Sequence, residues 1–315
     1  MEIILENIFS TQFIYSILRM ATPLILAAMA ALITRKAGVM CIAFEGIMLF
    51  GALGGVIGSA FSQNILIGVL TGVLFGVIIS FIFAYFVLVL NANTVLTGLA
   101  LNTLGSGGTV FILYVICGDK GTSTNLNSLT VPELNLPIIE DIPVLGSILS
   151  GHNLMTYVAL LAIVAVYLFI NKTALGLRIR SVGENPQAAE SVGIKVTRTR
   201  FIAIITAGVL ASLGGIYMSM GYLPFFTRDM IAGRGFMAIA AQNLGGGMVL
   251  PTTLSALLFG AAEALSNVMQ SLRLPAETMQ MLPYVITIFA LFFVGGTHKK
   301  KKKVRISHGK NTSNC

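Results

Sequence analysis

Few side chains of the types used in covalent catalysis or metal binding occur in this sequence of 315 residues. The histidines are His152, His298 and His308, and the cysteines are Cys41, Cys117 and Cys315. None of them has a partner at metal-ligand spacing, and no Ser/His/Asp or Cys/His set can be assembled from them. A GxxxxGK[ST] phosphate loop is also missing. We therefore expect no catalytic residue, metal or cofactor, no enzyme, and no ATP hydrolysis by the chain itself.

The most informative polar segment is residues 172–200, called here the basic loop because lysines and arginines flank a short helical pattern. Asn185 is a good helix N-cap, and Pro186 is favoured as the first residue of a helix. Gly193 can end the helix in a left-handed conformation. A helix of about two turns is not stable alone in water, so it must be held by its flanks or dock onto something. The pattern alone leaves open a surface helix and a knob that fits a partner protein.

Carboxylates inside apolar segments are candidates for a transport path. Glu45 lies just inside the second apolar segment, and Glu263 poses the same question in the eighth. A charge at this depth is costly unless it is paired or wetted. Glu45 can line a path, or it can bond to backbone or Arg19, or cap a neighbouring helix near Arg35. A structural role, in which Glu45 bonds to backbone or Arg19 or caps a helix, is favoured over lining the path.

Two polar stretches containing glycine stand in corresponding halves of the chain, at residues 101–105 and 242–247. Interrupted helices in such positions point to a binding region in the middle of the membrane. Amide side chains both donate and accept hydrogen bonds, as hydroxyl-rich or heterocyclic substrates require. The second stretch can instead be a cytoplasmic turn. The residues expected to line the path are Glu45, Thr97, Asn102, Gln242 and Asn243.

Lipid must surround the elements that position these groups. Hydrophobic residues make up 56% of the chain and charged residues only 10%, against about 25% charged in soluble domains. The composition predicts an all-α polytopic membrane protein of about eight or nine transmembrane helices, since about 20 apolar residues cross a bilayer. The segments are Thr11–Thr34, Val39–Ser59, Ile65–Leu90, Thr94–Cys117, Leu154–Ile170, Phe201–Leu223, Gly235–Leu244, Pro251–Gln270 and Met281–Gly295. The seventh is short, which indicates a tilted or broken segment.

The distribution of charge predicts the orientation. The net charge is +8, and residues 299–303 are all lysine. Positive charge near membrane segments favours the cytoplasmic side, so residues 299–315 are expected to form a basic cytoplasmic tail after a transmembrane domain of residues 1–298. Nine crossings then place the basic loop inside, and the acidic loop of residues 118–153 outside with the N-terminus. A lysine run directly after an apolar segment favours a stop signal over a nucleic-acid tail.

Glycines spaced four residues apart predict close helix contacts. Gly68, Gly72 and Gly76 share one helix face, and Gly51/Gly55 and Gly54/Gly58 form similar pairs. Small residues at this spacing allow two helix backbones to approach closely in lipid. The pattern indicates a tightly packed helix bundle, and it is equally typical of transporters, channels and membrane enzymes.

The segment from Gly183 to Ile194, which reads GENPQAAESVGI, resembles the cytoplasmic coupling motif of permease subunits of bacterial ABC importers. The branch in question takes up branched-chain amino acids, simple sugars and nucleosides. Residues 21–28, 35–46, 97–102, 233–241 and 256–260 resemble other blocks of the same family, in the family's order over nearly the whole chain. Cys41 departs from the pattern, since the family more often has asparagine ahead of the Glu-Gly pair.

This resemblance implies a bacterial plasma-membrane permease without enzymatic activity of its own. A cytosolic ATP-binding subunit would grip the short helix, a second permease chain would complete the pore as a heterodimer, and an external substrate-binding lipoprotein would deliver a small molecule. The expected ATPase-coupling residues are Gly183, Glu184, Asn185, Pro186, Ala188, Ala189, Glu190 and Gly193. The blocks look closest to nucleoside permeases, followed by simple-sugar and then branched-chain amino acid permeases. A stand-alone ion-coupled transporter is the rival, although few carboxylates and no histidine lie in the predicted helices.

Overall fold

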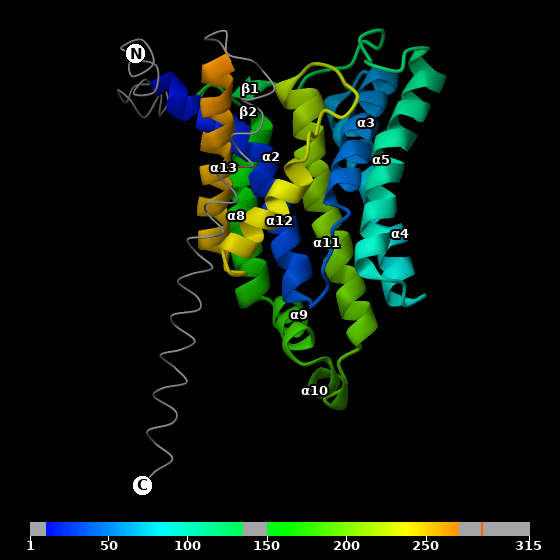
Figure 1. Ribbon diagram of the computed structural model, residues 1–315, viewed down its shortest axis with the longest axis vertical. Coiled ribbons are helices and arrows are strands. Elements are labelled where there is room, and N and C mark those ends of the chain that lie inside the picture. The colour runs from blue at the N-terminus through cyan, green and yellow to red at the C-terminus, as the bar shows by residue number, and fades with distance from the viewer. Residues whose placement is uncertain (1–10, 135–149, 271–284, 286–315) are drawn as a thin grey trace.

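The computed structural model describes residues 11–134, 150–270 and 285, and these form a bundle of helices (Figure 1). Within them, seven helices are long and apolar enough to cross a membrane. They are α2 (Thr11–Lys36), α3 (Phe44–Ser62), α4 (Ile65–Leu88), α5 (Thr94–Cys117), α8 (Leu154–Lys172), α11 (Val196–Ile216), which continues into the π-helical turn η1 (Tyr217–Tyr222), and α13 (Val249–Gln270). The prediction of an all-α polytopic membrane protein is therefore confirmed. Apart from residue 285, the predicted segment Met281–Gly295 and the tail lie outside the described residues.

The remaining elements are short. They are α9 (Ala174–Glu184), α10 (Pro186–Ser191), α12 (Arg234–Leu244), and the strands β1 (Glu133–Leu134) and β2 (His152–Asn153), which pair antiparallel. The strands lie at the same end of the bundle as the loop after α5, whereas α9 and α10 project from the opposite end (Figure 1).

The core is built around α2, whose residues from Met20 to Thr34 are all buried. Helices α13 and α11 pack beside it, and α3 and α4 pack against each other and against α11. Helices α4, α5 and α8 instead present apolar side chains such as Leu70, Phe111 and Leu161, each 67–69% exposed. In a protein surrounded by lipid, these outer faces need no polar side chains, because the bilayer is as apolar as the interior.

The glycine pattern of α4 marks its packing face, as predicted. Gly68, Gly72 and Gly76 are buried. A Cβ added to Gly72 would lie 2.7 Å from the carbonyl oxygen of Gly51, and one added to Gly76 would lie 2.4 Å from Cβ of Ser212. Only glycine leaves room for α3 and α11 at these distances, so the backbones approach closely.

Two passes through the bundle are broken, but not at the expected place in α5. Helix α5 runs without interruption from Thr94 to Cys117, so the expected break at residues 101–105 is wrong. A single glycine costs a helix only about 1 kcal/mol, and Gly105 packs directly against Gly46. The breaks lie instead at residues 37–43, ahead of α3, and at residues 223–233, ahead of α12.

The second break explains the short seventh segment. Helix α12 has 11 residues, about 16 Å at 1.5 Å per residue, roughly half the hydrocarbon thickness. The preceding non-helical stretch makes up the rest, since Thr227 pairs with Thr122 beyond α5 while Asn243 contacts Arg35 at the other end. Residues 222–245 thus cross as one broken pass.

Candidate functional site

The tip of the basic loop is the short helix α10, and it forms as its sequence predicts. The side-chain oxygen of Asn185 accepts from the backbone N–H of Ala188 at 3.1 Å, and Pro186 occupies the first turn. Gly193 has φ of +85°, and the Ile194 N–H donates to the Ala189 carbonyl at 3.0 Å. Both ends of the helix are therefore capped, so a helix of 6 residues is held by its own flanks.

The expected coupling residues divide between the surface and the interior of the loop. Ala189 is 3% exposed and packs inward, and Gly183 faces the core rather than the surface. The exposed residues are Glu184, Asn185, Gln187, Ala188, Glu190, Ser191, Val192 and Gly193. Val192, which the motif-based prediction omitted, is 74% exposed.

The base of this loop meets the break between α2 and α3. A Cβ added to Gly183 would collide with the carbonyl oxygen of Lys36, and one added to Gly38 would lie 3.1 Å from Cα of Gly183. Arg200 Nε donates to the carbonyl of Ala37 at 3.2 Å. The loop is thus joined to residues 36–38 by close backbone contact and by a charge-assisted hydrogen bond.

Glu45 occupies the junction of the two broken passes. Its carboxylate oxygens accept from the N–H groups of Gly233 at 2.7 Å and Gly235 at 2.8 Å, at the start of α12. The first N–H groups of a helix have no partners within the helix and carry partial positive charge, so a carboxylate stabilises them. Of the roles considered for Glu45, capping a helix fits this geometry. Arg19 bonds elsewhere, to the carbonyl of Tyr222 at 3.3 Å.

Glu263 of α13 is paired with Arg234, and the two charges meet at 3.3 Å. Arg234 also donates to the carbonyls of Met230 and Ile231, which belong to the break ahead of α12. A buried ion pair with further hydrogen bonds avoids the cost of an isolated charge in the membrane. The sequence-based analysis did not select Arg234, although an arginine between two glycines ahead of an apolar segment was a usable signal.

Asn102 of α5 braces the other break. Its amide nitrogen donates to the Ile42 carbonyl at 2.9 Å, and its oxygen accepts from the Gly46 N–H at 2.9 Å. The side chain is 9% exposed. The Thr97 hydroxyl, one turn from the start of α5, donates to the Asn93 carbonyl at 2.9 Å. Asn102 thus bonds next to Cys41, which lines the same pocket as Gln242, whereas Thr97 bonds within the first turn of α5.

Gln242 and Asn243 meet Arg35 near the end of the bundle that carries the basic loop. Arg35 Nη1 donates to the Asn243 side-chain oxygen at 2.6 Å. With its amide oxygen facing the guanidinium, Gln242 accepts from Nε at 3.2 Å and from Nη1 at 2.7 Å. Residues 245–247 form a turn directly after α12. In the stretch 242–247, the alternative of a turn is therefore right for residues 245–247, whereas Gln242 and Asn243 belong to the helix.

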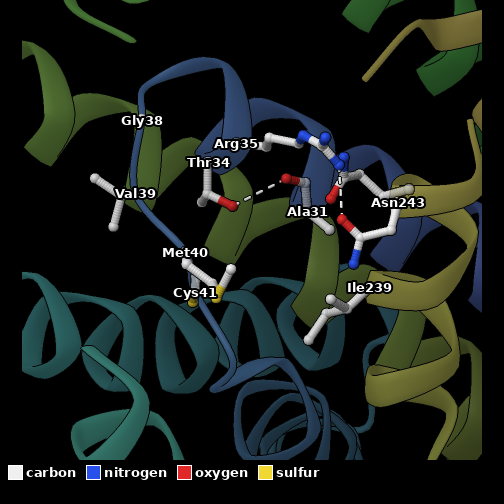
Figure 2. A pocket seen from close by; sticks show the side chains of 10 residues that line it. Ala31, Thr34, Arg35, Gly38, Val39, Met40, Cys41, Ile239 and Asn243 are labelled. Atoms are coloured by element: carbon white, nitrogen blue, oxygen red, sulfur yellow. Dashed lines mark hydrogen bonds between the residues drawn. The ribbon is translucent and has the colours of Figure 1, made fainter. Parts of the chain in front are cut away.

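A pocket of about 320 Å³ lies beside these polar groups. Figure 2 shows Arg35 reaching Asn243 across its rim, with Met40 and Cys41 on one wall and Ile239 on another. Among the described residues, no group of three or more histidine, cysteine, aspartate or glutamate side chains could hold a metal ion. The pocket lining offers hydrogen bonds and apolar contact to a ligand.

Fold and site together define a polytopic α-helical membrane protein with broken passes and a capped, exposed helix at one end of the bundle. Residues 13–291 match the family model described as branched-chain amino acid transport system / permease component, and the chain belongs to this family. It is 36% identical to the guanosine ABC transporter permease protein NupQ of Bacillus subtilis, over 87% of this chain and 89% of that protein. It is 32% identical to the nucleoside ABC transporter permease protein NupC of Lactococcus lactis, covering 92% and 93%. A further relative is the guanosine ABC transporter permease protein NupP of Bacillus subtilis, at 27% identity, covering 90% and 84%.

Proposed function

We propose that this chain is one of two permease subunits of an ATP-driven nucleoside importer. The observation that supports this most directly is the capped helix α10, held rigidly by its own ends and displaying Ala188, Glu190 and Val192 on its surface. A lone secondary transporter has no need of such a helix, whereas a separate ATP-binding subunit can grip it. The net positive loop would then face the cytoplasm, together with the C-terminus.

The second permease is proposed to be a different chain. NupQ and NupP, both guanosine permease proteins of Bacillus subtilis, are each related to this chain. Two related but distinct permeases for one named substrate in one organism favour a heterodimer. An external substrate-binding lipoprotein, which the resemblance to ABC importers implies, completes the proposed assembly.

The proposed path runs along the two broken passes, where backbone polar groups are held away from regular helix. Non-helical backbone at membrane depth is tolerated where it is buried in protein or lines a cavity. Gln242 and Asn243 remain candidate lining residues beside the pocket, because amide groups can read the donors and acceptors of a nucleobase. Glu45 and Asn102 instead hold the breaks in shape.

Uptake by the reconstituted transporter tests the coupling role of α10. Replacing exposed Ala188 with arginine should leave membrane insertion intact and reduce nucleoside uptake at least tenfold, because a bulky charge disrupts the grip of the ATP-binding subunit. The matched control is N125R, an exposed position in the loop after α5, which should keep both uptake and binding of the ATPase. Undiminished uptake by A188R would contradict the proposal.

A competition panel tests the substrate. Uptake of labelled guanosine by cells expressing the whole transporter should be blocked by unlabelled nucleosides and not by ribose, guanine or leucine. Uptake of labelled ribose with no uptake of guanosine would make the chain a simple-sugar permease, and uptake of labelled leucine with no uptake of guanosine would favour branched-chain amino acids.

A further inference from the structure

Helix α12 is held at its two ends by side chains that flank the same break. Arg35, in the last turn of α2, bonds to Gln242 and Asn243 at the end of α12. Glu45, in the first turn of α3, bonds to the N–H groups at its start. Residues 37–43 lie between Arg35 and Glu45. Any displacement of α2 relative to α3 across this break therefore pulls differently on the two ends of α12.

The backbone around α12 permits such a movement. Asp229, Ala232 and Gly233 have positive φ before the helix, and Gly246 and Gly247 have φ of +60° and +75° after it. Turns of this kind replace helical continuity on both sides, so α12 is a rigid rod of 11 residues between two non-helical joints. Hinges commonly fall at such element ends. At the start, the Arg234–Glu263 pair fastens the rod to α13.

The end of α12 that Arg35 holds, at Gln242 and Asn243, lies beside the pocket. The pocket of about 320 Å³ separates Ile239 from Met40 and Cys41. Apolar side chains therefore do not fill the space between this end of α12 and residues 37–43. The hydrogen bonds of Arg35 span it instead (Figure 2). Space beside the pocket end, together with the Glu45 cap and the Arg234–Glu263 pair at the start, favours a tilt about the start of α12.

The basic loop reaches Arg35 within three residues. Gly183 is in backbone contact with Lys36 and Gly38, and Arg200 bonds to Ala37. This contact is between backbones, with no flexible side chain to absorb a displacement. A push on α10 therefore arrives at the residues that follow Arg35 directly.

We propose that Arg35 is a positioning residue that transmits movement of the basic loop to the end of α12 and so tilts α12 beside the substrate path. This inference rests on the proposed function, because it assigns the push on α10 to an ATP-binding subunit. It differs from that function in naming the moving element and the side chain that pulls it.

Distance measurements in the whole transporter test the tilt without reference to substrate. Nitroxide labels are attached at L244C, a half-buried position at the end of α12 away from the pivot, and at L74C, an exposed position on α4, in a chain carrying C117S and C315S. The label separation should shift between the nucleotide-free state and the state trapped with ADP and vanadate. R35A should abolish this shift while ATP hydrolysis continues, and R35K should restore part of it. K172A, which removes an exposed charge at the end of α8, should leave the shift unchanged.

A second set of variants removes the same link from the α12 side. The double variant Q242A/N243A should lower uptake per ATP hydrolysed at least tenfold, and R35A should lower it by a similar factor. The triple variant R35A/Q242A/N243A should lie within twofold of the double variant and of R35A, because each variant removes the same connection. A shift that persists in R35A, or that is missing from the unaltered chain, would overturn the proposal, as would multiplicative losses in the triple variant. Absence of nucleoside uptake with a normal α12 shift would instead count against the substrate, leaving the link intact.

Discussion

At the scale of single residues, the polar groups inside the bundle satisfy one another and the backbone at breaks in the helices. Glu45 and Asn102 bond to N–H groups at the first turns of α12 and α3, and Arg234 neutralises Glu263. Where no water is available, each broken helix end needs such a partner. A carboxylate or amide in these passes is therefore first of all a structural group, and the geometry of the path depends on it.

Replacing Glu45 with glutamine tests this role. One of the two N–H groups at the start of α12 would then face an NH2 group, so a charge-assisted hydrogen bond is lost, and such bonds contribute about 1.5–3 kcal/mol each. We expect E45Q to lower the midpoint of thermal unfolding of the purified transporter in detergent. E133Q, an exposed carboxylate in β1, should leave the midpoint unchanged, and an unchanged E45Q midpoint would show that the cap does not matter.

At the scale of elements, the bundle combines continuous helices with two broken passes, and the glycines serve the continuous ones. The face of α4 formed by Gly68, Gly72 and Gly76 allows α3 and α11 to lie against it without intervening side chains. Helix α12, by contrast, owes its separation to non-helical stretches on both sides. Close packing keeps the first group rigid, and the joints leave α12 able to move.

A methyl group added at the α4 packing face tests this rigidity. Because a Cβ at Gly72 would lie 2.7 Å from backbone oxygen of Gly51, G72A should separate the helices and lower the unfolding midpoint and the yield of assembled transporter. The matched substitution G107A in α5 meets nothing within 4 Å. It should be neutral or slightly stabilising, since alanine favours helix over glycine by about 1 kcal/mol. Equal effects of the two substitutions would exclude close packing as the cause.

At the scale of the whole molecule, charge separates the two ends of the bundle. The end with α9 and α10 carries exposed Lys172, Arg178, Lys195 and Arg198. The opposite end carries Asp119, Glu133 and Asp229 together with Lys120 and Arg228, so it has no such excess of positive charge. An excess of lysine and arginine in short loops predicts which end faces the cytoplasm.

Accessibility of single cysteines measures this orientation. In the C117S, C315S background, N125C at one end should react with a membrane-impermeant maleimide in intact cells, because its loop is expected outside. Q187C in α10 should react only after the cells are permeabilised. Labelling of Q187C in intact cells would reverse the orientation and remove α10 from reach of a cytosolic ATPase.

The sequence by itself determined the all-α membrane class, the packing face of α4 and the capped helix α10. Each depends on local rules: apolar segment length, glycine spacing of four residues, and the Asn-Pro start and glycine end of one short helix. These signals lie within a few turns of chain, so they can be read without knowing what packs against them.

Only the tertiary structure decided where the breaks lie and which polar groups serve them. Asn102 bonds to residues 56 and 60 positions away, Glu45 to residues 188 and 190 away, and Arg35 to one 208 away. Gly105 looked like a break and is instead a packing contact, because its neighbour Gly46 belongs to another helix. Such partners are chosen by the folding of distant segments onto one another, and a local pattern carries no information about them.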